Sequence, residues 1–282
     1  MTSVVSISSL KGGVGKTSVA LGLASAAQAR GLRVLVVDMD PHGDASTGLG
    51  VRAVDAQSGA DMGAMLAAPG NFTLTEEIRP SSWVALGALG NASATGKDAG
   101  VWVGRASARL ARLEQEKATE ALPNLAQLLK PALPDFDLIL VDCPPTLGHL
   151  TEIAWAASDR VLSVAEPSLF SVAGSERTLR ALARFEANTE HAVSSASIVV
   201  NKVREGDPEH SYRNQEMRQL FGDLVAEPSL PETPLLQRIQ GAAYPIHYWP
   251  EAEAQQLADA FSELLTGLVQ APEASQGEAR AS

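Results

Sequence analysis

The sequence lacks the features of a secreted or membrane-embedded protein. Cys143 is its only cysteine, which excludes an internal disulfide and an iron–sulfur site built from cysteine pairs within one chain. No apolar run approaches the roughly 18 residues that a membrane-spanning helix needs. The first residues show no basic region followed by an apolar core, so we expect no secretory signal. A reduced, cytoplasmic setting fits these absences.

Positive charge is also scarce. The chain has 22 Lys and Arg against 33 Asp and Glu, a formal net charge of −11, and a sequence pI of about 4.9. This balance argues against a surface covered in positive potential. Hydrophobic residues make up 45% of the 282 residues, and the mean hydropathy is +0.01. These values predict a soluble globular chain, long enough for one large α/β domain or two small ones.

The most informative stretch is K-G-G-V-G-K-T-S at 11–18, which lies between a β-branched run at 4–8 and an Ala/Leu-rich run at 19–30. Strand, Gly-rich turn, Lys-Thr and helix is the order of a phosphate-binding loop. The glycines let successive backbone N–H groups face phosphate oxygens, and the helix N-terminus adds partial positive charge. We expect Lys16 to reach the β/γ-phosphates and the Thr17 hydroxyl to bind Mg²⁺. The predicted nucleotide contacts in this loop are Gly12, Gly13, Val14, Gly15, Lys16, Thr17 and Ser18.

A second lysine, Lys11, precedes the glycines, and an ordinary phosphate-binding loop does not require it. With Lys11, the loop resembles the deviant Walker A motif of the ParA/MinD family. The resemblance implies an ATP-dependent homodimer in which two nucleotide sites face each other, and in which Lys11 reaches the partner's nucleotide. The alternative is a solvated lysine at the edge of a loop.

Two acidic residues follow the next predicted strand. The run L-R-V-L-V-V at 32–37 is continuously apolar apart from one arginine, which favours a parallel strand covered on both faces. It ends in D-M-D-P-H-G-D at 38–44, where ligands bind in open α/β sheets. This pattern resembles the second signature of the ParA/MinD family. The resemblance implies that Asp40 orients or activates the attacking water and that Asp38 lies near the Mg²⁺ ion.

The same loop departs from the family pattern at two positions. His42 stands where glutamine is common, and Asp44 stands where asparagine or serine is common. We interpret His42 as a neutral surface residue rather than a catalytic one. Without the two lysines, the acids of this loop would be read as solvated residues of a turn.

A third motif is F-D-L-I-L-V-D-C-P-P at 136–145, an apolar strand that ends in Asp142. Its order after the first two motifs makes it a Walker B strand. The Asp142 carboxylate is then expected near Mg²⁺, through water, because Mg²⁺ gives up its hydration reluctantly. The D-x-P-P ending again resembles the family.

Three later segments complete the resemblance. E-P-S-L-F-S-V-A-G at 166–174 resembles the family segment at the dimer interface. A strand at 196–200 ends in Asn201-Lys202, and the resemblance implies that Asn201 hydrogen-bonds the adenine ring. Without that context, Asn201 could equally be a turn residue. L-P-E at 230–232 matches the segment in which backbone near Pro231 touches the base. We therefore add Asn201, Lys202 and Pro231 to the predicted nucleotide contacts.

These elements predict a single α/β domain over 1–270, with one doubly wound, mostly parallel sheet flanked by helices, as in P-loop NTPases. The region 51–130 is the least informative. We expect a short helix at 60–67, an edge segment at 73–78, a strand at 83–89, a flexible loop at 90–100, and helices at 101–121 and 124–129. The 101–121 helix would carry Arg105, Arg109 and Arg112 on one face. Further helices are expected at 147–157, 169–188, 209–221 and 251–269.

The tail 271–282 is expected to be disordered. It lacks the basic, bulky-apolar helix that binds a membrane surface, so we expect no membrane partner.

The resemblance implies Mg²⁺-dependent ATP hydrolysis that an adaptor protein stimulates, ParB-like or of another kind. It also implies non-specific DNA binding by the ATP-bound dimer, and with it a nucleoid-associated location. DNA binding needs phosphate-neutralising side chains, and the candidates are Arg204, Arg213, Arg218 and Arg238. Acidic residues lie among them: from 202 to the end there are 6 Lys or Arg against 13 Asp or Glu.

Three functions therefore stay open. The first is a partition ATPase of ParA type that acts on DNA in chromosome or plasmid segregation. The second is a similar ATPase that positions or regulates a protein cargo, with weak or no DNA binding. The third is a metabolic P-loop kinase or ligase, which would require a substrate pocket beside the γ-phosphate. Lys11 and the D-x-D-P-x-G pattern favour the first two.

Overall fold

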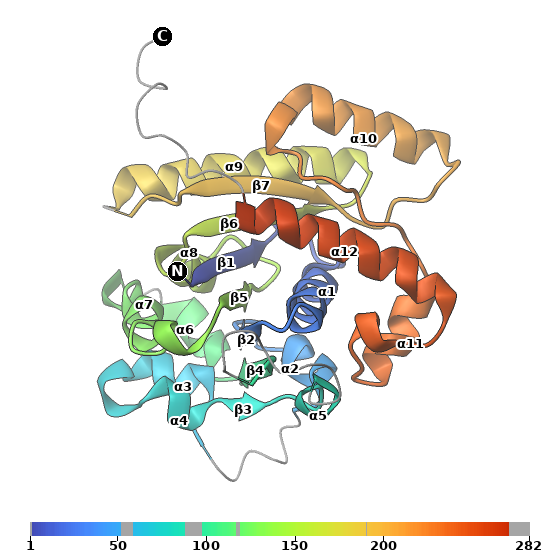
Figure 1. The fold of residues 1–282 in the computed structure, drawn as a ribbon. Coiled ribbons are helices and arrows are strands. Elements are labelled where there is room, and N and C mark those ends of the chain that lie inside the picture. Colours follow the sequence, from blue (N-terminus) through green and yellow to red (C-terminus); the bar gives the residue numbers. More distant parts are fainter. Residues whose placement is uncertain (1, 52–58, 88–97, 117–118, 190, 271–282) are drawn as a thin grey trace.

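A seven-stranded sheet runs through the centre of the molecule (Figure 1). The computed structural model describes residues 2–51, 59–87, 98–116, 119–189 and 191–270. The strand order is β3-β4-β2-β5-β1-β6-β7, and only the edge strand β3 is antiparallel to its neighbour. The strands are β1 (Ser3–Ser8), β2 (Arg33–Asp38), β3 (Arg79–Pro80), β4 (Gly100–Gly104), β5 (Leu138–Asp142), β6 (Arg160–Ala165) and β7 (Ser195–Val200). This confirms the predicted doubly wound, mostly parallel α/β fold.

Helices cover both faces of the sheet (Figure 1). One face is covered by α1 (Lys16–Ala29), α11 (Leu235–Gly241) and α12 (Ala252–Gln270). The other is covered by α3 (Met62–Ala67), α6 (Leu110–Glu116), α7 (Asn124–Leu129), α8 (His149–Ala156) and α9 (Leu169–Asn188). The remaining helices are α2 (Asp44–Gly48), α4 (Leu74–Glu77), α5 (Val84–Gly87) and α10 (Pro208–Phe221). Among the residues with described positions, no helix is long and apolar enough to cross a membrane.

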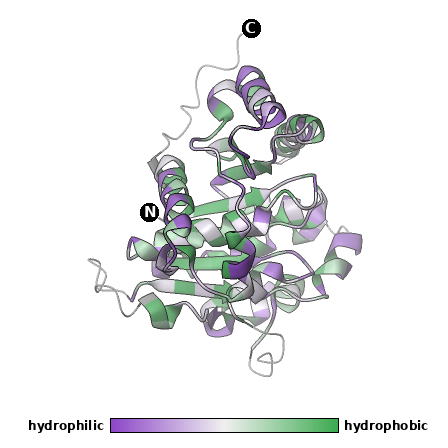
Figure 2. Ribbon diagram, turned by 90° about the vertical axis from the view of Figure 1, so that its right-hand side faces the viewer, coloured by the Kyte–Doolittle hydropathy of each residue, from purple (hydrophilic) through white to green (hydrophobic). Residues whose placement is uncertain are grey.

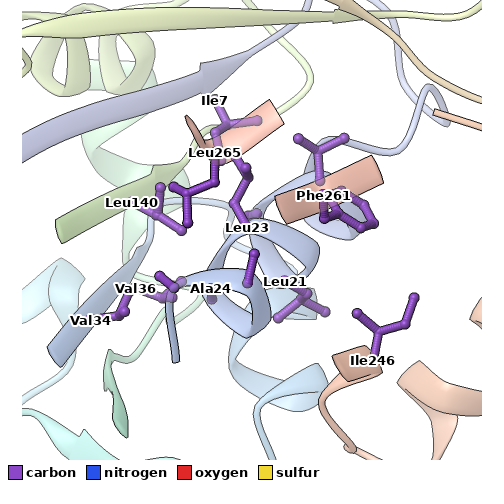
Figure 3. Packing of buried hydrophobic residues seen from close by; sticks show 14 of the residues in the cluster. Ile7, Leu21, Leu23, Ala24, Val34, Val36, Leu140, Ile246, Phe261 and Leu265 are labelled. Atoms are coloured by element: carbon purple, nitrogen blue, oxygen red, sulfur yellow. The ribbon is translucent and has the colours of Figure 1, made fainter. Parts of the chain in front are cut away.

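The central strands are apolar because both of their faces are buried. Apolar residues colour the inner strands green in Figure 2, while hydrophilic residues gather on the outer helices. In Figure 3, Leu23 of α1 lies among side chains from β1, β5 and α12. The helices α1 and α12 approach closely because Gly22 has no side chain: a Cβ there would lie 2.2 Å from the Phe261 ring. Helix α1, which begins at the phosphate-binding loop, is therefore held firmly in the core.

The register of the strands brings three chain segments to one edge of the sheet. Asp142 of β5 pairs with Ile7 of β1 on one side and with Asp38 of β2 on the other. The carboxyl ends of β1, β2 and β5 therefore lie side by side. The loops that follow these strands carry the three predicted motifs, as expected for a parallel sheet.

The expectations for 51–130 were partly wrong. The strand lies at Gly100–Gly104, beside β2, and not at 83–89, where Val84–Gly87 forms a helical turn and 88–89 lie outside the described residues. V-W-V is short and bounded by glycines, and its pairing with β2 outweighs any helical pattern around it. Most of the predicted loop 90–100 also lies outside the described residues, as does the tail 271–282.

Three neighbouring expectations change with this correction. The helix expected at 101–121 begins only at Leu110, so Arg105 lies in a loop, buried, and donates to the Gly59 carbonyl instead of sharing a helix face with Arg109 and Arg112. The expected edge segment at 73–78 forms the turn α4, and the edge strand follows it at Arg79–Pro80. The short helices α3 and α7 are close to where they were predicted.

Candidate nucleotide-binding site

The loop between β1 and α1 has the backbone of a phosphate cradle. Gly13 and Gly15 have φ angles of 78° and 95°, which favour glycine. A Cβ on Gly15 would lie 2.3 Å from Nδ2 of Asn201, so no other residue fits there. Helix α1 begins directly after this glycine, at Lys16. The loop therefore presents the N-terminal N–H groups of α1, which have no partner within the helix, to a ligand.

A cavity of about 550 Å³ opens over this loop. The structure brings most of the predicted contacts to its wall: Gly12, Gly13, Gly15, Lys16, Thr17, Ser18, Asp40, Asn201, Lys202 and Pro231. Val14 is different, because its side chain is buried in the core and its carbonyl accepts a hydrogen bond of 2.8 Å from Nδ2 of Asn201.

Sequence reasoning missed one wall of the cavity. Leu236, Gln237 and Gln240 of α11 line it, together with Thr233 just before the helix. The spacing of Gln237 and Gln240 on a short helix was the only signal for this wall, and it is a weak one. This part of the cavity wall is therefore formed by a segment that the sequence motifs did not indicate.

Two acidic side chains lie buried beneath the loop. Thr17 donates from Oγ1 to Oδ2 of Asp142 at 2.8 Å, while the second oxygen, Oδ1, is buried without a hydrogen-bond partner among the described residues. Asp38 accepts from the backbone N–H and hydroxyl of Ser46 at 2.8 and 2.7 Å. Burial raises the pKa of Asp38 to about 6. Burial, and then the Asp38 carboxylate, raise the pKa of Asp142 well above its usual range.

Lys16 is also buried, and burial lowers the pKa of its ammonium group while Asp142 opposes this effect. A buried carboxylate with an unused oxygen beside a hydroxyl is the donor set that a hard cation prefers. No cluster of three or more His, Cys, Asp or Glu side chains forms a metal cage in the described part of the chain. The residues present therefore fit a Mg²⁺ ion that takes its other ligands from phosphate and water.

The signature lysine is paired within its own chain. Nζ of Lys11 contacts Oε1 of Glu166, which precedes α9. Next to this pair, the first turn of α9 exposes two large apolar side chains, Leu169 and Phe170, the latter 77% exposed. Lys11 therefore lies near the loop glycines but does not face the cavity they line.

The loop after β2 holds Asp40 and His42 together. Oδ1 of Asp40 accepts from the backbone N–H of His42 at 3.0 Å and contacts its Nδ1 at 2.8 Å. The hydrogen bond and the negative charge of Asp40 raise the pKa of His42. His42 is exposed, as expected for a surface residue, and its ring contacts Asp40, the predicted water-orienting acid.

The turn after β7 is tied to the phosphate loop. Asn201 donates to the Val14 carbonyl, and Nζ of Lys202 donates to the Gly13 carbonyl at 2.5 Å. Lys202 adopts a positive φ of 60°, unusual for a residue with a side chain. These contacts bring the predicted adenine side next to the predicted phosphate side.

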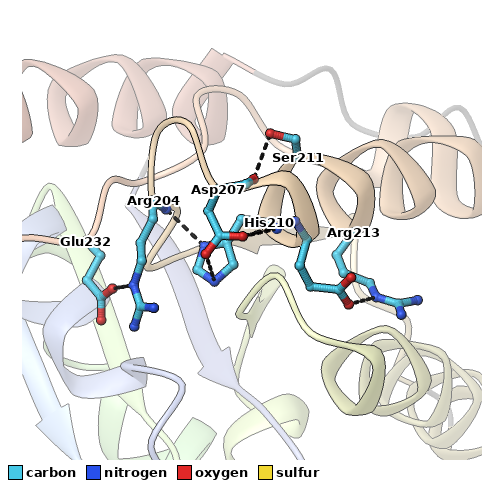
Figure 4. A network of polar contacts seen from close by, with 7 residues as sticks. Arg204, Asp207, His210, Ser211, Arg213 and Glu232 are labelled. Carbon is cyan, nitrogen blue, oxygen red and sulfur yellow. Dashed lines mark hydrogen bonds and ion pairs between the residues drawn. The ribbon is translucent and has the colours of Figure 1, made fainter.

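The four candidate DNA-binding arginines all have acidic partners. Arg204 pairs with Glu232 (Figure 4). Arg213 pairs with Glu209 at 2.6 Å and with Glu216 at 2.8 Å. The other two pairs are Arg218 with Glu227 and Arg238 with Glu251. Each candidate arginine therefore has a carboxylate within ion-pair distance, which lowers the positive potential around it.

Comparison with known proteins agrees with this geometry. A family model described as an AAA domain matches residues 2–195. The chain belongs to the ParA/MinD family of P-loop ATPases. It is 27% identical over 233 residues to the chromosome partitioning protein ParA of Caulobacter vibrioides, covering 81% of this chain and 80% of that protein. It is 33% identical to the ParA of Myxococcus xanthus over 171 residues, 61% of this chain and 54% of that protein.

Solved structures show the same fold at lower identity. McdA of Cyanothece has a TM-score of 0.78 with 18% identity, covering 94% of this ParA/MinD-family chain and all of McdA. Cobyrinic acid a,c-diamide synthase of Mycobacterium smegmatis, solved with ADP and magnesium, has a TM-score of 0.74 with 21% identity, covering 95% of this chain and 94% of the synthase. Because the two have different names and the same fold, the fold alone does not decide the function.

Proposed function

We propose that this protein binds ATP with Mg²⁺ and hydrolyses it as a dimerising switch ATPase of ParA type. The observation that carries the proposal is the buried Asp142 carboxylate, which has one oxygen bound to Thr17 and one without a partner, directly beneath a phosphate-binding loop. Leaving a buried acceptor unsatisfied costs about 1–3 kcal/mol, so its presence points to a ligand that satisfies it. A hydrated Mg²⁺ ion held with the nucleotide is such a ligand.

Each predicted residue then has a role. Lys16 neutralises charge on the β/γ-phosphates, Thr17 and Asp142 hold the cation directly or through water, and Asp38 supports its hydration shell. Mg²⁺ supplies further charge neutralisation when it is bound. Asp40 lies on the cavity wall and orients the attacking water. Catalysis here consists of positioning and charge stabilisation, as in other phosphoryl-transfer enzymes.

The paired lysine gives the switch a physical basis. Lys11 contacts Glu166 of its own chain, so it must leave this carboxylate before it can reach a nucleotide in a second copy. Leu169 and Phe170 are exposed beside it and would be covered in such a dimer. ATP binding that favours the dimer, and hydrolysis that dissolves it, make a two-state switch.

The switch has two candidate targets, DNA and a protein cargo. The names of the ParA relatives support chromosome partitioning. In this first candidate the ATPase partitions a chromosome or plasmid through nucleotide-gated DNA binding, and a ParB-like or other adaptor stimulates hydrolysis. The paired arginines favour the second candidate, in which the ATPase positions a protein cargo and binds DNA weakly or not at all. Acidic partners lower the positive potential that non-specific DNA binding depends on.

The metabolic alternative shares the fold but not the signature. A kinase or ligase needs a small acceptor beside the γ-phosphate, whereas Lys11 and the D-x-D-P pattern are the features of a switch ATPase. Phosphate release from ATP without any added acceptor, measured at saturating Mg²⁺, separates the two. Turnover that starts only when a small acceptor is supplied would support the metabolic enzyme and refute our proposal.

One set of measurements tests the switch and its target together. The molecular mass and the binding to a random-sequence DNA duplex are measured with ATP, with ADP and without nucleotide, at two salt concentrations. An ATP-dependent doubling of mass is expected. Salt-sensitive DNA binding only with ATP would support partitioning on DNA, whereas a dimer that ignores DNA would support the protein-cargo candidate. An unchanged monomer in every state would exclude the switch.

A further inference from the structure

His42 is the residue at which the nucleotide site departs from the family pattern and yet makes a specific contact. Its side chain is 78% exposed, whereas that of Asp40 is only 14% exposed. Both the backbone N–H and the Nδ1 atom of His42 lie within hydrogen-bond distance of the same carboxylate oxygen, Oδ1 of Asp40. The His42 ring is therefore exposed to solvent but fixed in position by its contact with a mostly buried carboxylate at the cavity wall. A histidine that served only as a solvated surface residue would not require this contact.

This contact makes the two oxygens of Asp40 different. Oδ1 receives two donors from the loop, at 3.0 and 2.8 Å. Within the described ranges of the chain, Oδ2 receives none. Rotation of the carboxylate about its terminal bond is a soft motion with broad minima. The two bonds from His42 therefore fix an orientation that the Asp40 side chain would not keep alone.

We propose that His42 is a positioning residue for ATP hydrolysis: it holds Oδ1 of Asp40 so that Oδ2 is the oxygen presented to the attacking water. This inference rests on the proposed role of Asp40 in the same site. Because His42 acts through Asp40 and not on the bound nucleotide, it affects the turnover step and not the affinity for ATP. The reaction itself is unchanged: water attacks the γ-phosphorus, the bond to the β-phosphate oxygen breaks, and ADP and phosphate leave.

The charge of the ring adds a pH dependence. The charged side chains that act on His42 are Asp40 and Asp44, both from its own loop, and both raise its pKa above the ordinary value of 6.5. The neighbouring loop after β4 packs against Gly43 through Ala106, which carries no charge. A protonated ring places a positive charge beside the Asp40 carboxylate, which weakens the attraction of that carboxylate for the attacking water. The turnover number should therefore rise as the pH rises through the pKa of His42.

Two substitutions separate positioning from charge. His42→Leu removes the Nδ1 donor but keeps the backbone N–H, and we expect kcat to fall about tenfold while the KM for ATP stays within about twofold, because only one of the two contacts that orient Asp40 is lost. His42→Asn places an amide nitrogen where Nδ1 lies but cannot titrate. It should restore most of kcat and flatten the pH profile above pH 6.5, the ordinary pKa that the loop raises for His42. Unstimulated hydrolysis at saturating Mg²⁺ and ATP is the measurement.

His191→Asn is the matched control. The His191 ring contacts the Ser158 carbonyl at 2.9 Å, beside the start of β6 and at the opposite edge of the sheet from the cavity. This substitution removes a histidine from the chain without touching the site. The His191→Asn variant should have the same kcat and the same pH profile as the parent protein. Any change seen in the His42 variants can then be assigned to the nucleotide site.

Three results would overturn the inference. They are a His42→Leu variant with the parent kcat, a His42→Asn variant with the parent pH profile, or a His42→Leu variant whose melting temperature and ATP affinity fall together with kcat. Failure of the proposed function looks different, because the parent protein itself would hydrolyse no ATP or Asp40→Ala would turn over normally. If Asp40→Ala traps ATP while His42→Leu turns over like the parent, only the role of His42 is rejected. The proposed function of the site then stands.

Discussion

The buried edge of the sheet and the surface that carries the candidate arginines handle charge in opposite ways. Beneath the phosphate loop, Asp38, Asp142 and Lys16 are removed from water, and one Asp142 oxygen has no partner. On the surface formed by α10, α11 and the adjoining loops, every candidate arginine has a carboxylate within reach. The first arrangement is costly until a ligand completes it, and the second is complete by itself. Unsatisfied charge, rather than charge alone, therefore indicates where this protein binds something.

The largest effect is expected from Asp142→Asn, which keeps the hydrogen bond from Thr17 but removes the negative charge. Hydrolysis should fall about 1,000-fold, the upper range for loss of one stabilising group in a phosphoryl-transfer site. Where Asp142 is ionised, the nucleotide-free variant should also be more stable than the parent by about 1–3 kcal/mol, because the amide has no negative charge to bury. Urea unfolding and phosphate release measure the two effects. If the nucleotide-free variant is less stable than the parent, burial of the Asp142 carboxylate does not destabilise the folded protein.

The second prediction concerns pH. Burial raises the pKa of Asp38 to about 6, whereas in the unfolded chain it is about 3.9. The native state therefore holds this proton longer, and the stability that Asp38 contributes is lost as the pH rises through 6. Between pH 5.5 and 7.5, the parent protein without nucleotide should lose about 1 kcal/mol relative to Asp38→Asn. The free energy of unfolding of both proteins is measured at the two pH values. The same difference between parent and Asp38→Asn at both would contradict the prediction.

The third prediction uses the pair that joins the loop to α9. Glu166→Gln frees Lys11 from its own chain, so the ATP-bound dimer should become about fivefold tighter, as expected for release of a partly exposed ion pair. Lys11→Ala should abolish the dimer. Sedimentation with ATP and with ADP measures both. An ATP-dependent dimer that persists in Lys11→Ala would remove the lysine from the interface.

The smallest effects are expected from the arginine surface. Arg218→Ala should change the stability by less than about 0.5 kcal/mol, since exposed ion pairs contribute little. Removing the acidic partners instead, by Glu227→Gln together with Glu232→Gln, should raise binding to a random-sequence DNA duplex at low salt by a few-fold or less. A much larger increase would show that these two carboxylates suppress DNA binding. The ion pairs on this surface would then regulate DNA binding rather than merely satisfy the arginines.

Sequence alone predicted the nucleotide edge well because its determinants are local. Each motif is a strand and the few residues after it, and the parallel sheet brings their carboxyl ends together without further information. Lys16, Thr17, Asp38 and Asp142 lie together at this edge for this reason. Their proposed chemical roles are still predictions.

The remaining features depend on contacts between distant residues. The V-W-V strand at 101–103 has no periodic pattern of its own and is defined by its pairing with β2. Glu232 lies 28 residues from Arg204, and Glu166 lies 155 residues from Lys11. No local pattern in the sequence indicates such pairs, so sequence analysis could not predict the acidic partners of Lys11 and Arg204.

The turn after β7 connects the phosphate-binding loop to the surface of the molecule. Asn201 and Lys202 hold the carbonyl groups of Val14 and Gly13. The turn continues through Arg204 into α10, whose exposed side chains include Tyr212 and Leu220. One short segment of chain therefore connects the two carbonyl groups of the phosphate-binding loop to a surface helix outside the cavity.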